Sequence, residues 1–245
     1  MRPFNARSLV LSVLLGLDPP VLPGRTLVEL ADVFGIAPGT MRTALSRMAA
    51  ADELVIDGDG YRLVGRLLER KEAQDIGRRP APRAWDGTWT VAVVTAPRRS
   101  IASRRAFRSH MATLRMGELR PDTWLRPANL APPAGDDELA VVRGPLDGEE
   151  PHALAARLWP LASIAATARE LTGRLDAMLP ALADRRADAL PPTITLAAEV
   201  VRFLRAEPLL PPVLTPQPWS PDALRDRYHE FDRALGRTLR HAVRG

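Results

Sequence analysis

The 245-residue sequence contains no cysteine and only four histidines. Without cysteine the chain has no disulfide, no cysteine-ligated metal and no thiol nucleophile, and its composition fits a reducing, cytoplasmic setting. The histidines have no metal-ligand spacing and lie in no nucleophile motif. A glycine-rich phosphate loop is also missing from the sequence. These absences predict a protein that is not an enzyme and that holds no metal or other cofactor.

Long apolar runs are missing as well. The sequence has no stretch near the roughly 18 apolar residues that a membrane-spanning helix needs. Arg7 and Asp18 bracket the apolar segment near the N-terminus, and no small-residue cleavage site follows, which argues against a signal peptide. Hydrophobic residues make up 46% and charged residues 26%, ordinary values for a soluble globular protein. We therefore expect no membrane partner.

The segment from residue 26 to 48 has the pattern of two short helices joined by a tight turn. Thr26 and Glu29 have the spacing of a capping box. Gly35 suits a left-handed end to the first helix, and Pro38 suits the first turn of the second. Both halves carry apolar residues at helical spacing: Leu27, Leu30, Ala31 and Phe34, then Met41, Ala44, Leu45 and Met48. The pattern predicts a helix-turn-helix, and another kind of amphipathic helix pair is the alternative.

The polar face of the second helix suits the major groove of DNA, where Arg, Ser and Thr reach base edges or phosphates. The candidate DNA-binding residues on it are Thr40, Arg42, Thr43, Ser46 and Arg47. An apolar helix upstream and a hairpin with an Asp-Gly turn at 54–64 complete the order of a winged helix. Asp57 and Asp59 in that turn are poor partners for phosphate, so Arg62 at the hairpin base is the sixth candidate.

Changes in composition divide the chain into three predicted domains. Residues 1–76 form the winged helix, 77–84 a linker rich in proline and arginine, and 148–245 a mostly helical domain that we assign to dimerisation and effector binding. The range 85–147 has an α/β pattern, with a helix expected at 101–114 and strands expected at 88–95, at 117–125 with a break at Pro121, and at 139–142. This order is compatible with a small split βαβ sandwich, and the predicted fold class is α+β.

In several segments the sequence resembles the PaaX family of transcriptional repressors, named for control of phenylacetate catabolism. The similar segments are FGIAPGTMRTALSRM at 34–48, WDGTWTVAVV at 85–94, and the ranges 117–130, 158–161 and 208–214. The resemblance implies a homodimer that binds a palindromic double-stranded DNA operator. It also implies release from that operator by a small effector, such as an aryl- or acyl-CoA thioester.

The same resemblance implies a ferredoxin-like central domain, related to that of small CRISPR-associated nucleases. Those nucleases carry an aspartate at the end of the first strand, where it holds a metal. Here the strand ends Val93-Val94-Thr95-Ala96, so we predict no metal nuclease.

An arginine run at residues 98–108 has three interpretations. It is a solvated helix face, a contact with DNA beside the operator, or a site for the phosphates of a CoA-type effector. For the effector, the candidate residues in this run are Arg104, Arg105 and Arg108. A hydrophobic pocket between the second and third domains is expected to add Trp124, Arg126 and Trp159, although each tryptophan of the chain also suits core packing.

The sequence as a whole predicts a sequence-specific DNA-binding regulator, a repressor released by an effector. The alternative is a non-catalytic protein-interaction module that uses the winged helix and the helical C-terminus as a scaffold. Loss of sequence-selective DNA binding would favour this alternative.

Overall fold

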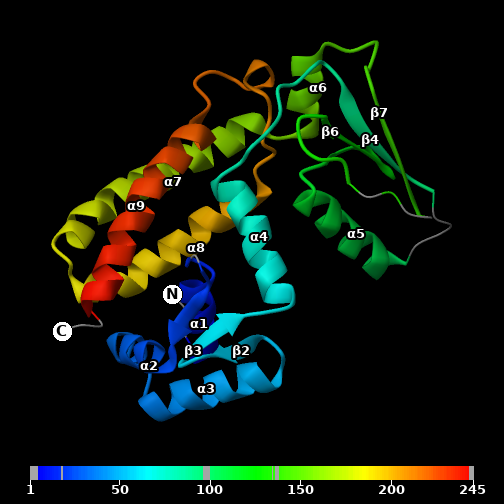
Figure 1. Ribbon diagram of the computed structural model, residues 1–245. Coiled ribbons are helices and arrows are strands. Elements are labelled where there is room, and N and C mark those ends of the chain that lie inside the picture. Colours follow the sequence, from blue (N-terminus) through cyan, green and yellow to red (C-terminus); the bar gives the residue numbers. More distant parts are fainter. Residues whose placement is uncertain (1–4, 18, 96–99, 134, 136–137, 243–245) are drawn as a thin grey trace. The chain divides into compact units, whose positions relative to one another are not determined.

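The computed structural model describes residues 5–17, 19–95, 100–133, 135 and 138–242. Helices combine with two antiparallel sheets, so the predicted α+β class is confirmed (Figure 1). The chain divides into two compact units. The first contains the residues up to Asp75, Glu170–Arg202 and those from Leu224 onward, and the second contains Ile76–Arg169 and Phe203–Ala223. No described helix is both long and apolar enough to cross a membrane.

The first unit begins with helix α1, Ala6–Leu14. Its N-cap is Asn5, whose side chain accepts a hydrogen bond from the Ser8 amide at 2.8 Å. The Ser8 hydroxyl in turn accepts a hydrogen bond from the Asn5 amide at 3.0 Å. This reciprocal capping box pairs two amides that the first turn leaves free. The apolar face of α1, including Leu9 and Leu14, is buried.

Helices α2, Gly24–Val33, and α3, Pro38–Ala50, form the predicted helix pair. Gly35 lies between them with a φ of 66°, and Pro38 is in the first turn of α3, as predicted. The capping box predicted at Thr26 is wrong. Helix α2 starts at Gly24, directly after an extended N-cap at Pro23, so Thr26 is already inside the first turn.

Three short strands form an antiparallel sheet beside these helices. Strands β2, Leu54–Asp57, and β3, Gly60–Leu63, make the predicted hairpin, with Asp57 paired to Gly60. Strand β1, Val21–Pro23, pairs with β3 on its other side, which gives the order β1-β3-β2. Strand β1 cannot be recognised in the sequence pattern because it is three residues long and ends in proline. Helix α4, Arg66–Arg78, follows and extends two residues into the range predicted as a linker.

The second unit contains a four-stranded antiparallel sheet. Its strands are β4, Trp89–Val94, β5, Gly117–Arg120, β6, Thr123–Pro127, and β7, Leu139–Gly144, in the order β5-β6-β4-β7. Helix α5, Ile101–Thr113, connects β4 to β5. The break predicted at Pro121 is confirmed, because Pro121 and Asp122 separate β5 from β6 and Asp122 has a φ of 65°.

Alternation along the strands gives this sheet two buried faces. Trp89 of β4 and Leu125 of β6 belong to one core, which also contains residues of the helices that follow β7. Trp124 belongs to the other core, together with Met111 of α5. The Trp124 ring meets the edge of Phe107 with ring centres 6.2 Å apart. Adjacent residues of β6 therefore serve different cores, because successive side chains of a strand point to opposite faces.

The chain ends in four helices: α6, Pro151–Leu158, α7, Leu161–Ala183, α8, Leu190–Ala206, and α9, Ser220–Ala242. Short 3-10 turns lie at Ala187–Ala189 and Pro212–Leu214. In the first unit, Arg174 of α7 pairs with Glu199 of α8 at 2.6 Å. The Thr238 hydroxyl of α9 donates to the Leu182 carbonyl at 3.0 Å. The domain boundaries at residues 76, 84 and 147 remain a prediction.

Candidate nucleic-acid interface

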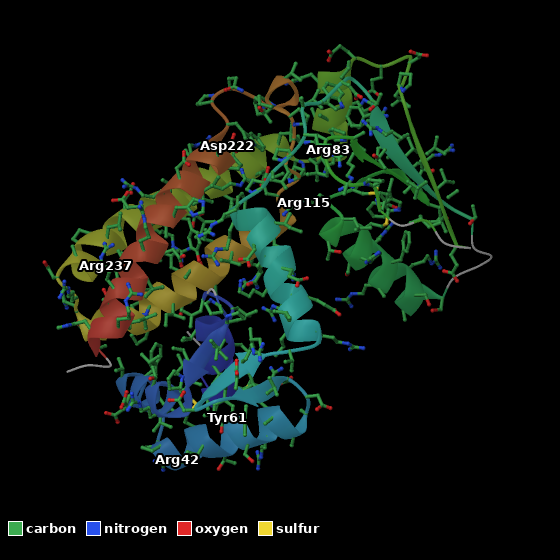
Figure 2. All side chains as sticks on the ribbon, in the orientation of Figure 1. Arg42, Tyr61, Arg83, Arg115, Asp222 and Arg237 are labelled. Carbon is green, nitrogen blue, oxygen red and sulfur yellow. The ribbon has the colours of Figure 1, made fainter. Side chains whose placement is uncertain are left out.

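Helix α3 exposes a polar face of five predicted residues. The side that faces the interior carries Met41, Leu45 and Met48, each at most 2% exposed. The exposed residues on the other side are Thr40, Arg42, Thr43, Ser46 and Arg47. Arg42 lies at the surface of the helix (Figure 2). Neither Arg42 nor Arg47 has an ion-pair partner among the described residues, so both guanidinium groups are available to a ligand.

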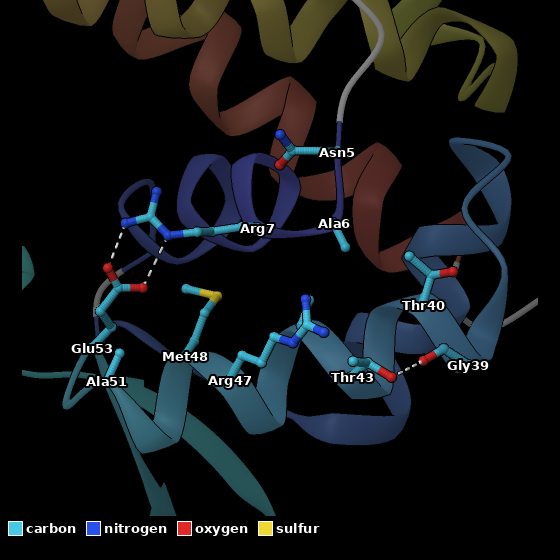
Figure 3. A pocket seen from close by; sticks show the side chains of 11 residues that line it. Asn5, Ala6, Arg7, Gly39, Thr40, Thr43, Arg47, Met48, Ala51 and Glu53 are labelled. Carbon is cyan, nitrogen blue, oxygen red and sulfur yellow. Dashed lines mark hydrogen bonds and ion pairs between the residues drawn. The ribbon is translucent and has the colours of Figure 1, made fainter.

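One flank of α3 borders a groove of about 730 Å³ that separates it from the start of α1 (Figure 3). From α3 and its C-terminal end, the groove is lined by Gly39, Thr40, Thr43, Ala44, Arg47, Met48 and Ala51. From the other side it is lined by Asn5, Ala6 and Arg7, with Glu53 at one end. Arg42 and Ser46 are not among the lining residues. The structure therefore separates the five predicted residues into two groups on the same helix.

An ion pair lies at one end of this groove. The Arg7 Nε is 3.0 Å from Glu53 Oε2, and the Arg7 Nη2 is 2.5 Å from Glu53 Oε1. The hydrogen bonds from Arg7 lower the pKa of the Glu53 carboxyl group, so the acid stays ionised and paired. Arg7 and Glu53 offset each other in charge, and Arg47 leaves the lining with a net positive charge.

Two of the groove threonines differ in their free hydrogen-bonding capacity. The Thr43 hydroxyl donates its hydrogen to the Gly39 carbonyl, 2.9 Å away within the helix. A hydroxyl has one hydrogen, so Thr43 has none left for a ligand while this bond holds. The Thr40 hydroxyl has no hydrogen-bond partner among the described residues.

Arg62, the sixth predicted DNA-binding residue, lies on β3 and is exposed. Its Nε is 3.1 Å from the Asp57 carboxylate on the neighbouring strand. Both side chains are about half exposed, at 48% and 47%. A phosphate would therefore compete with Asp57 for this guanidinium.

The predicted effector residues do not form one group. Arg104 and Arg105 are exposed on α5, while Arg108 is paired with Glu118 at 3.0 Å. Arg98 and Arg99 of the same run lie outside the described residues, as does Ala96 at the end of the first strand. Trp124 and Arg126 are buried on β6, and Trp159 packs half-buried against the core that contains Trp89. Trp124 itself belongs to the core on the opposite face.

Arg126 is a buried cation, only 4% exposed. Its Nη1 donates to the Leu114 carbonyl at 2.9 Å and its Nη2 donates to the Ala131 carbonyl. Among the described residues its Nε has no hydrogen-bond partner. Burial lowers the pKa of Arg126 to about 10, because a buried guanidinium loses the solvation of its charge.

The other wall of the groove does not follow from the sequence pattern; it consists of Asn5, Ala6, Arg7 and Glu53. Arg7 and Glu53 are 46 residues apart, and no local spacing links them. The only signal in the sequence was that α1 precedes the helix pair, which is the order of a three-helix domain. No group of three or more His, Asp and Glu side chains that could hold a metal occurs within the described part of the chain.

Comparison with known proteins relates this chain to one family. The family model for PaaX-like proteins matches residues 5–67, and that for the PaaX protein central Cas2-like domain matches residues 82–136. A search of curated proteins finds no match to the sequence. The solved structure of the uncharacterised protein Rv0674 from Mycobacterium tuberculosis is similar, with 36% sequence identity and a TM-score of 0.78. The similarity covers 97% of this chain and 98% of that one. As its sequence predicted, the chain belongs to the PaaX-like protein family.

Proposed function

We propose that this protein is a sequence-specific DNA-binding transcriptional regulator whose first unit carries a winged helix. The element order supports this reading. Helix α1, strand β1, helices α2 and α3 and the β2–β3 hairpin follow one another, with the three strands paired as β1-β3-β2. In a winged helix, the helix in the place of α3 enters the major groove.

The observation that carries the proposal is the exposed face of α3. It presents two arginines without ion-pair partners, Arg42 and Arg47, together with Ser46 and two threonines. A free guanidinium at such a position can form two hydrogen bonds to guanine or neutralise a phosphate.

The central sheet supports a ferredoxin-like domain. Numbered within this domain, the strands follow the order 2-3-1-4, which is the order of a ferredoxin-like sheet. A helix connects the first two strands, whereas the described residues between β6 and β7 contain no second helix. The match of residues 82–136 to a Cas2-like domain model is consistent with this assignment.

We further propose that the protein is a homodimeric repressor on a palindromic operator and that an acyl- or aryl-CoA thioester releases it. Arg104 and Arg105 are the best candidates for the effector phosphates, because both are exposed and have no ion-pair partner among the described residues. Arg108 is the weaker candidate because Glu118 already neutralises it. Trp124, Arg126 and Trp159 would contact an effector only if their packing opened.

In vitro selection of duplexes from a random oligonucleotide pool, with the full-length protein, tests DNA recognition. We expect a palindromic sequence to be enriched and retained in a gel shift. Arg42→Ala should lose selective retention while its circular dichroism spectrum and melting temperature stay unchanged. If the unaltered protein enriches no sequence, the proposal is wrong and the protein-interaction alternative gains support. If it enriches a sequence but Arg42→Ala retains the selected duplex normally, the assignment of Arg42 to base recognition is wrong.

Calorimetric titration with a panel of acyl-CoA thioesters tests the effector. The active compound should release the selected duplex in a gel shift. The double variant Arg104→Gln/Arg105→Gln should weaken thioester binding more than Arg108→Gln does. Equal effects of the two variants would remove Arg104 and Arg105 from the proposed site.

A further inference from the structure

We infer that the groove beside α3 binds one sugar-phosphate strand of DNA. Arg47 and Thr40 bind phosphate there, while Arg42 contacts base edges. This inference rests on the proposed DNA-binding function. The sequence predicted DNA contacts for five residues of α3 without distinguishing them. This inference assigns some of them to phosphate binding and others to base recognition.

The major groove is bounded by two sugar-phosphate strands. A helix inside it therefore faces the base edges and has one sugar-phosphate strand along each flank. The groove between α3 and α1 follows one of these sides, and Thr40, Thr43 and Arg47 line it. Arg42 lies outside the groove, in the N-terminal half of α3. The N-terminal part of a recognition helix is the part that contacts base edges.

The lining matches the chemistry of a backbone strand. Deoxyribose is largely apolar and each phosphate is anionic. Ala44 and Ala51 offer small apolar surfaces to the sugars, and Arg47 offers a cation to the phosphate. Glu53 does not repel the strand, because Arg7 already neutralises it.

The two threonines of the groove differ in whether they can donate a hydrogen bond to a phosphate. A phosphate oxygen accepts hydrogen bonds and cannot donate them, so its partner must have a free hydrogen. The Thr40 hydroxyl has one, whereas the Thr43 hydroxyl is committed to the Gly39 carbonyl. The phosphate should therefore contact Thr40 and Arg47 and gain less from Thr43.

Fluorescence anisotropy tests this division, using the full-length protein with the duplex enriched by selection and a scrambled duplex of equal length and composition. Arg47→Gln should weaken binding to both duplexes by the same factor. It should also reduce the slope of log affinity against log salt by about 0.9, the contribution of one phosphate contact. Arg42→Gln should instead reduce the preference for the selected duplex roughly 5- to 150-fold.

Two further variants test the groove itself. Thr40→Val should weaken binding to both duplexes roughly 3- to 10-fold, and Thr43→Val should have a smaller effect because its hydroxyl is bonded to the Gly39 carbonyl. Thr195→Val on α8, whose hydroxyl likewise donates to a carbonyl of its own helix, is the matched control and should leave both affinities unchanged. Ala51→Trp, which fills the groove without changing charge, should weaken binding to both. Arg237→Gln on α9 controls for the loss of one positive charge, and each variant should keep the melting temperature of the unaltered protein.

The outcomes separate the two proposals. If the unaltered protein binds no DNA, the proposed function and this inference fail together. If it binds selectively but Arg47→Gln lowers the preference more than Arg42→Gln does, this inference fails and the proposed function stands. It fails in the same way if Arg47→Gln matches Arg237→Gln, or if Ala51→Trp binds normally, because the groove would then have another use.

Discussion

Arg7 and Glu53 are joined by two hydrogen bonds, of 3.0 and 2.5 Å, between the start of α1 and the loop after α3. The arginine holds the pKa of the Glu53 carboxyl group below its usual range. The unfolded chain, in which this carboxyl group has its ordinary pKa, therefore takes up the proton first as the pH falls. The stability that the pair contributes is present above about pH 4.3 and is lost as the pH falls through the lower pKa of the folded state.

We expect Glu53→Gln to lower the free energy of unfolding by about 0.5 kcal/mol near pH 7, as is typical of a pair in contact with water. The side chains of Arg7 and Glu53 are 53% and 25% exposed, so solvent screens much of their attraction. Urea denaturation at pH 7 and at lower pH measures the effect, and a double-mutant cycle with Arg7→Gln isolates the pair. The difference should shrink below about pH 4. A constant difference at every pH would show that the charge of Glu53 is not responsible.

Two buried arginines of the second unit should differ in their contribution to stability. Arg115 donates hydrogen bonds to the carbonyls of Leu204, at 3.2 Å, and Glu207, at the C-terminal end of α8. Arg115→Met should lower the free energy of unfolding by about 2–4 kcal/mol, because two buried carbonyls lose this donor. Arg126→Met should lower it less, because the buried Nε of Arg126 has no hydrogen-bond partner among the described residues and its desolvation cost disappears with the side chain.

Guanidinium chloride denaturation compares the two arginine variants. Arg105→Met on the exposed face of α5 is the matched control and should stay within about 0.5 kcal/mol of the unaltered protein. A loss from Arg126→Met that equals or exceeds the loss from Arg115→Met would contradict the argument.

Two helical glycines should respond in opposite directions to alanine. A Cβ at Gly77 in α4 would lie 2.6 Å from the carbonyl oxygen of Leu204, a backbone atom that cannot move aside alone. Gly77→Ala should therefore lower the free energy of unfolding by about 1–3 kcal/mol. A Cβ at Gly173 in α7 meets nothing within 4 Å, so Gly173→Ala should raise it by about 0.5–1 kcal/mol. Thermal and denaturant unfolding check both signs, and destabilisation by both variants would refute the steric reason.

Two acidic residues of the hairpin allow a matched test of its effect on DNA affinity. Asp57 is ion-paired with Arg62 at 3.1 Å, whereas Asp59 has no ion-pair partner among the described residues. Asp57→Asn should raise DNA affinity roughly 2- to 5-fold, because it frees Arg62 for a phosphate. Asp59→Asn makes the same change in net charge and should have a smaller effect in the same anisotropy assay. Equal gains would mean that only the net charge of the hairpin matters.

Much of the local structure could be predicted because its causes are local. The helix pair followed from the apolar spacing, from Gly35 in its left-handed conformation and from Pro38 in the first turn of α3. The hairpin followed from its Asp-Gly turn, and the break after β5 followed from Pro121. The start of α2 was predicted wrongly at Thr26. Pairing of β1 with β3, about 40 residues later, extends the chain up to Pro23 and leaves Gly24 to begin the helix.

The candidate site shows the same division. That Thr40, Arg42, Thr43, Ser46 and Arg47 are exposed follows from the period of one helix. Their separation into a groove flank and a free flank depends on where α1 lies, and no residue near α3 encodes that. For the predicted effector residues, the sequence pattern did not reveal burial. Trp124 and Arg126 looked available in the sequence but are buried on β6, because the sheet has a core on each face.

The sequence by itself determined most of the helices, turns and strands, and which face of α3 is polar, because these depend on neighbours a few positions apart. It also determined the family, since matching segments recur along the chain in order. Only the tertiary structure decided which polar residues share a surface. The pairing of Arg7 with Glu53, the groove beside Arg47 and the burial of Arg126 each bring together residues with no local relation. Such contacts arise from the packing of whole elements, which a local pattern does not contain.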